Sequence, residues 1–147
     1  MRMTFTKGRG KYDDLRVERE GRAVEIIQCP KQGIIPHDMV HYAVESTLGH
    51  RGFLGMVADG AAAAFTTQGG AVEAAIERLV ETFQAEMWGG RVPVADLIAT
   101  YEHACAASGH AVAPVSVGDI DAVRARIEAL SADWARVPVG GSLTVRF

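Results

Sequence analysis

Two histidines four residues apart are the strongest chemical feature of this sequence. His37 and His41 follow Pro36, and proline is common in the first turn of a helix. On a helix, residues i and i+4 lie on one face, one turn apart, so both imidazoles can bind the same cation. Neutral imidazole nitrogens are good zinc ligands. The spacing therefore predicts that His37 and His41 form half of a zinc site.

Two acidic residues belong to the same segment. Asp38 follows the first histidine and gives H-D-x-x-H, which resembles the H-E-x-x-H motif of zinc metalloproteases, where the acid is the general base. The resemblance implies that role for Asp38, although its side chain is one methylene shorter and a base must come within about 2.6–3.2 Å of its proton. Glu45 lies about 12 Å along the helix axis from His37. It is a second candidate catalytic base, or it shares a cation with His41, or it orients His41 through a hydrogen bond.

A zinc site needs at least one further ligand from elsewhere in the chain. The sequence offers four candidates and does not choose among them: Glu102, His103, His50 and Asp59. Two interpretations without a metal also stay open. In the first, Asp38 stabilises the positive end of the helix and the histidines border its apolar face, so the cluster is structural. In the second, the histidines and acids form a metal-free acid–base or ligand-binding site.

The same segment resembles a signature of small uncharacterised bacterial proteins, H-D-[LM]-x-H-[FY]-x-V-E followed by G-F-[FWL]-G. Here residues 36–45 read PHDMVHYAVE and residues 52–55 read GFLG. The match spans residues 36–55 of the chain. The resemblance implies a bacterial cytoplasmic protein and no particular activity.

The composition predicts one globular domain that covers residues 1–147. Hydrophobic residues make up 48% of the chain and charged residues 22%, which is ordinary for a domain with a sizeable core. The net charge is -3 and the basic residues do not cluster, so we expect no nucleic-acid partner. No apolar run approaches the roughly 20 residues that span a bilayer, and the first residues lack a signal-peptide core. We therefore expect a cytoplasmic protein with no membrane partner, whose two cysteines are reduced.

The hydrophobic pattern predicts an α+β fold. Alternating segments predict strands that form a small, mostly antiparallel sheet, which includes the last residues of the chain. The predicted strands cover residues 4–7, 15–19, 23–28 and 143–147. Apolar residues at i, i+3 and i+4 predict helices over residues 36–48, 71–87, 94–107 and 119–134. Alanines favour a further helix over residues 52–65, but three glycines weaken it.

Two functional hypotheses follow. The first is a small binding or interaction module, expected to form a homodimer, whose His/Asp/Glu cluster lines a pocket for a small molecule or a protein. The second is a metal-dependent hydrolase with His37 and His41 as zinc ligands and Asp38 or Glu45 as the base. Metal content, and its loss when His41 is replaced by alanine, distinguish the two.

Overall fold

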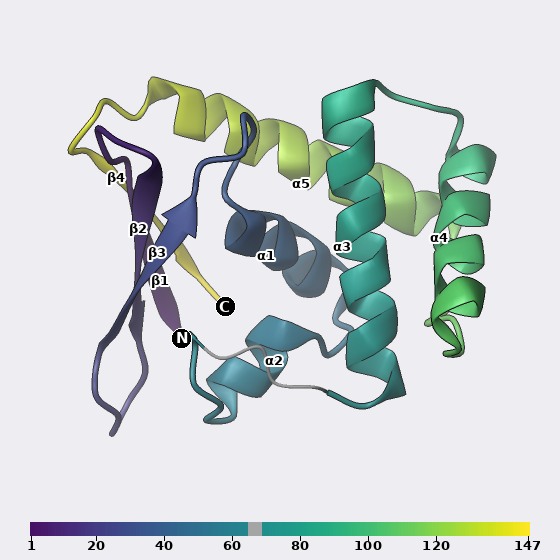
Figure 1. Cartoon of the computed structure of the whole chain (residues 1–147), viewed down its shortest axis with the longest axis horizontal. Coiled ribbons are helices and arrows are strands. Elements are labelled where there is room, and N and C mark those ends of the chain that lie inside the picture. Colours follow the sequence, from purple (N-terminus) through teal and green to yellow (C-terminus); the bar gives the residue numbers. More distant parts are fainter. Residues whose placement is uncertain (65–68) are drawn as a thin grey trace.

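The computed structural model describes residues 1–64 and 69–147 and confirms the α+β fold (Figure 1). The strands are β1 (Arg2–Thr6), β2 (Tyr12–Glu18), β3 (Glu25–Pro30) and β4 (Ser142–Arg146). The helices are α1 (His37–Leu48), α2 (Phe53–Ala58), α3 (Ala71–Gly89), α4 (Val94–Ser108) and α5 (Val117–Arg136). No helix among the described residues is both long enough and apolar enough to cross a membrane.

The sheet joins the two ends of the chain, as the alternating C-terminal segment predicts. Its strand order is β3-β2-β1-β4, and every neighbouring pair is antiparallel. Beyond the paired strands, the amino group of Met1 donates a hydrogen bond of 2.9 Å to the carbonyl oxygen of Phe147. Alternate residues of β1 and β2, such as Met3 and Leu15, are apolar and fully buried. Because alternate side chains of a strand point to the same side, these residues form one apolar face of the sheet.

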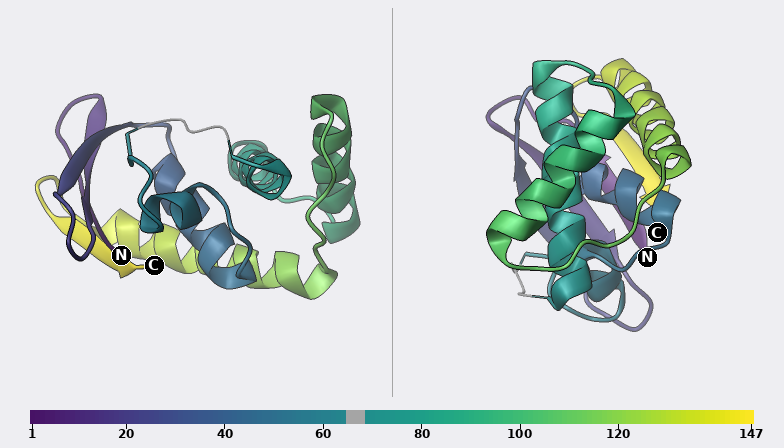
Figure 2. Two further views of the ribbon diagram at one scale, coloured as in Figure 1. Left: turned by 90° about the horizontal axis from the view of Figure 1, so that it is seen from below. Right: turned by 90° about the vertical axis from the view of Figure 1, so that its right-hand side faces the viewer.

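Helix α1 is the central helix of the molecule. It lies between the sheet and α3, while α4 lies beyond α3 and α5 runs along the side of these layers (Figures 1 and 2). Its residues from Met39 to Glu45 are all buried, so its polar side chains must find partners inside the protein. The helix ends at Gly49, which has a left-handed conformation (φ 66°) and turns the chain toward α2.

The segment 52–65 differs most from its predicted form. Its helix is only α2, which is six residues long and begins after Gly52. Residue 65 lies outside the described residues. At the other end of the chain, α5 begins two residues earlier than predicted because Ser116 and Asp119 form a capping box, in which each side chain accepts a hydrogen bond from the other's backbone N–H.

Candidate metal site

Helix α1 lies beside α3 (Figure 1), and the side chains of His37 and His41 on α1 contact Glu77 of α3. The two imidazole rings stand one helical turn apart, with ring centroids separated by 4.7 Å. Their Nε2 atoms face each other at 3.1 Å. The i, i+4 spacing thus brings the two nitrogens to one point, as the sequence predicts.

His41 lies between two carboxylates. It is 1% exposed, its Nδ1 lies 2.9 Å from Oε2 of Glu45, and its Nε2 lies 2.8 Å from Oε2 of Glu77. Burial lowers the pKa of His41, but hydrogen bonds to Glu45 and Glu77 outweigh this effect and raise the pKa to about 9. The metal-free protein therefore holds His41 as an imidazolium at neutral pH.

Glu45 is fully buried and makes four hydrogen bonds. Its Oε1 accepts from the backbone N–H groups of Gly52 (2.9 Å) and Gly55 (3.0 Å), and its Oε2 accepts from that of Leu54 (3.1 Å) and from His41. Glu45 therefore orients His41 and fixes the first turn of α2 at once. The oxygens of Glu45 face the protein interior. Glu45 is therefore placed to orient His41, which is one of the three roles that the sequence left open for it.

Gly52 is required by this arrangement. A Cβ atom at residue 52 would lie 2.6 Å from Cδ of Glu45 and 2.7 Å from Cγ2 of Ile76. Both distances are shorter than van der Waals contact. A side chain at residue 52 would therefore displace the buried carboxylate from His41.

His37 has a neutral acceptor in place of a carboxylate. Its Nδ1 lies 3.1 Å from Oε1 of Gln84 on α3, and Nε2 of Gln32 donates to the same oxygen at 3.0 Å. Because that oxygen can only accept, Nδ1 of His37 carries the proton and Nε2 has the free lone pair. His37 is thus held in the tautomer that leaves the Nε2 lone pair free for a metal ion. His41 would reach the same tautomer on losing its Nε2 proton, because Nδ1 faces the carboxylate of Glu45.

Glu77 completes a group of three ligands. His37, His41 and Glu77, which we call the His–Glu cluster, each offer a ligand atom, and these atoms lie within 4.8 Å of one another. The Nε2–Nε2 distance is 3.1 Å, and Glu77 oxygens lie 2.8 Å from Nε2 of His41 and 3.5 Å from Nε2 of His37. Two atoms that are each about 2.1 Å from a tetrahedral zinc are about 3.4 Å apart. The cluster can therefore hold a metal ion with small shifts.

The sequence did not identify Glu77, and none of the four predicted third ligands joins the cluster. His50 lies 3.1 Å from the carbonyl oxygen of Pro114, Asp59 pairs with Arg51, and Glu102 and His103 are exposed on α4. A sequence signal for Glu77 exists. Glu73, Glu77 and Gln84 fall within about 40° of arc on α3, so three polar groups follow one line beside the apolar face of that helix.

The His–Glu cluster opens into a cleft with a volume of about 910 Å³. Asp38, which is half-buried, also lines it, together with Phe53 and Met56 of α2. Burial raises the pKa of Asp38 more than the imidazoles of His41 and His37 lower it. Asp38 is thus the acid of the H-D-x-x-H pattern that faces a space where a substrate could bind.

A comparison with protein-family models, curated proteins and solved structures gives no match for this chain.

A substitution of Gln84 tests whether it positions His37. Gln84→Met keeps the length of the side chain but removes the acceptor for Nδ1, so we expect the zinc dissociation constant, measured by competition with a chelator, to rise about tenfold. Gln84→Glu retains an acceptor and should bind zinc nearly as tightly as wild type. Gln28→Met, on the exposed side of β3, is the matched control. Equal affinities for Gln84→Met and Gln28→Met would contradict the positioning role.

Proposed function

We propose that this protein is a metal-dependent hydrolase that binds one zinc-like ion at His37, His41 and Glu77. The observation that carries the proposal is the convergence of three ligand atoms at the wall of a large cleft. Catalytic zinc sites hold the ion with three protein ligands and leave a position open for water, and two histidines with one glutamate is a known set. A bound metal lowers the pKa of that water, which supplies a nucleophile at neutral pH.

Asp38 is the proposed general base. It lies next to His37 in the chain and lines the same cleft as the His–Glu cluster, so it could take a proton from a water that the bound metal would activate. Burial raises the pKa of Asp38, which makes the carboxylate a stronger base for accepting a proton and returning it to the leaving group. Glu45 has a different proposed role, because its oxygens are occupied by backbone N–H groups and by His41. It positions His41.

Metal analysis and an activity screen test the proposal together. Protein without an affinity tag is incubated with zinc, desalted and analysed by mass spectrometry, and is then assayed on chromogenic esters, phosphoesters and dipeptides. We expect about one zinc per chain and hydrolysis of at least one substrate class that a chelator abolishes and zinc restores. Zinc-loaded protein that hydrolyses no class would contradict the hydrolase, and protein that takes up no zinc would contradict the metal site.

Replacing Asp38 separates metal binding from catalysis. Asp38→Asn keeps the shape of the side chain but cannot accept a proton, so we expect the zinc content to stay at the wild-type level and kcat to fall about 100-fold. The measurement is kcat on the best substrate from the screen, beside Asp14→Asn on the exposed side of β2 as the control. Unchanged kcat in Asp38→Asn would remove Asp38 from the mechanism.

A binding module without a metal is the second candidate. It is favoured by the hydrogen bonds of the metal-free cluster, in which His41 is held by two carboxylates and Glu45 organises the start of α2. The cluster would then stabilise a pocket for a small molecule or a protein partner. This candidate predicts no zinc after incubation and desalting, together with a large loss of stability when His41 is replaced.

A further inference from the structure

The cleft has a second polar region beyond the His–Glu cluster. Arg78, Ser108 and His110 line it, and we call this region the arginine end of the cleft. Arg78 follows the proposed ligand Glu77 on α3, whereas Ser108 is the last residue of α4. Nη1 of Arg78 donates to Oγ of Ser108 over a long distance of 3.4 Å, and Nη2 donates to Glu81 at 2.7 Å.

Two nitrogens at the arginine end have no hydrogen-bond partner. Among the described residues, three buried side-chain nitrogen or oxygen atoms lack a partner: Nε of Arg19, Nε of Arg78 and Nε2 of His110. Two of these three belong to residues that line the cleft. Such atoms are rare in folded proteins because an unmet donor is unfavourable when it is shielded from water. Nε of arginine can only donate, so its requirement for an acceptor is unmet, and the side chain that carries it lines the cleft.

Of the four acids that line the cleft, Glu73, Glu77 and Glu81 are paired. The fourth, Asp38, follows His37 at the His–Glu cluster, so none of the described cleft acids is both unpaired and part of the arginine end. Glu73 pairs with Arg51 at 3.2 Å, and Glu77 with His41. Glu81 holds Arg78 from the surface, where its side chain is 49% exposed, and an exposed ion pair of this kind is weak. A ligand oxygen can therefore replace Glu81. The negative end of α4 opposes an anion, but this effect is small and confined to the last turn.

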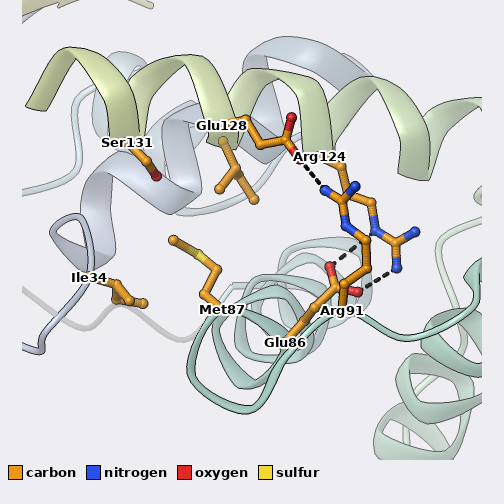
Figure 3. A pocket seen from close by; sticks show the side chains of 8 residues that line it. Ile34, Glu86, Met87, Arg91, Arg124, Glu128 and Ser131 are labelled. Atoms are coloured by element: carbon orange, nitrogen blue, oxygen red, sulfur yellow. Dashed lines mark hydrogen bonds and ion pairs between the residues drawn. The ribbon is translucent and has the colours of Figure 1, made fainter. Parts of the chain in front are cut away.

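A second pocket shows the contrasting case. It has a volume of about 400 Å³ and lies beside α5 and the end of α3 (Figure 3). Its two arginines are both paired: Arg124 with Glu86, and Arg91 with Glu128. Nε of Arg124 also donates to Glu86. The second pocket therefore differs from the cleft in that it contains neither of the unpartnered nitrogens.

We propose that the arginine end of the cleft binds the carboxylate or phosphate group of the substrate. This inference rests on the proposed hydrolase and names its substrate class: an anionic molecule whose reacting bond lies at the His–Glu cluster. A planar guanidinium suits both oxyanions, since it can donate two parallel hydrogen bonds. Small and apolar residues of the same cleft would contact the part of the substrate between its two ends: Phe53, Met56, Ala63 and Ala74.

The test measures binding of acetate and of methylphosphonate by isothermal titration calorimetry. Wild type, Arg78→Gln, His110→Ala and Arg91→Gln are compared, each with zinc and without metal. Arg91→Gln is the matched control, because Arg91 also pairs with an exposed glutamate but lies in the second pocket. We expect Arg78→Gln to weaken anion binding at least about tenfold, His110→Ala to weaken it severalfold, and Arg91→Gln to leave it unchanged. The tighter-binding probe identifies the oxyanion.

Several results would overturn the inference while leaving the metal site intact. One is zinc-loaded wild type that binds neither anion. Another is Arg78→Gln that folds, as judged by circular dichroism, and binds as tightly as wild type, which would place the anion on the metal alone. Equal losses in Arg78→Gln and Arg91→Gln would indicate an effect of net charge only. If no zinc binds, the metal-free comparison of wild type and Arg78→Gln still decides the anion site.

Discussion

The double variant His37→Ala/His41→Ala is expected to lose bound metal, from about one zinc per chain in wild type to less than about a tenth. Two of the three ligand atoms disappear, and Glu77 alone holds a divalent ion no better than any surface carboxylate. The measurement is elemental analysis by mass spectrometry after incubation with zinc and desalting. A competing chelator then gives the change in affinity, which should exceed about a thousandfold because both imidazole ligands, which suit zinc, are lost.

The control for this experiment is a second pair of histidines. His50→Ala/His103→Ala also removes two imidazoles, but these residues lie outside the His–Glu cluster, so zinc content should stay at the wild-type level. Glu77→Gln should bind zinc more weakly than wild type, since the amide loses the charge that balances the ion. Zinc retained by the His37→Ala/His41→Ala variant would move the metal elsewhere. Loss of zinc in both double variants would indicate unspecific binding to histidines.

Much of the fold follows from local sequence patterns. Alternation over residues 143–147 predicts a strand, and β4 does pair with β1, because apolar residues on alternate positions need a sheet with one covered face. The i, i+4 spacing of His37 and His41 predicts that their rings meet, and Nε2 atoms 3.1 Å apart confirm it. Both inferences depend on the geometry of a single element, which the sequence determines directly.

The rest of the site depends on how elements pack, which local patterns do not contain. Glu77 reaches His41 only because α3 crosses α1 at the level of these two residues. The same line of polar residues on α3 would be compatible with other crossing positions. Glu45 receives its partners because the chain reverses at Gly49 and returns the N–H groups of residues 52, 54 and 55 to it. The spacing of Glu45 from His41 left three roles open for Glu45. The loop after α1 supplies the backbone N–H groups that decide which of these roles it has.

Glu45→Ala is expected to lower the free energy of unfolding of the metal-free protein by about 3–5 kcal/mol, which is roughly 150-fold to 5,000-fold in the folding equilibrium. The carboxylate is fully buried and accepts from three backbone N–H groups and from His41. Its removal leaves those donors without an acceptor and an imidazolium without one of its two counter-charges. Urea denaturation followed by circular dichroism, in the presence of a chelator, measures the loss.

Glu45→Gln separates the charge of Glu45 from its volume, and Glu128→Ala is the control. Glu45→Gln keeps the shape but offers one acceptor oxygen, and its amide NH₂ then faces a backbone N–H or His41, so we expect most of the loss to remain. Glu128→Ala, which removes an exposed carboxylate on α5, should change the stability by less than about 0.5 kcal/mol. If Glu45→Gln were as stable as wild type, the charge would be dispensable, and packing around Gly52 would account for the conformation of α2. A large loss of stability in both Glu45 variants, with none in Glu128→Ala, would mean that one buried carboxylate both orients His41 and fixes the start of α2.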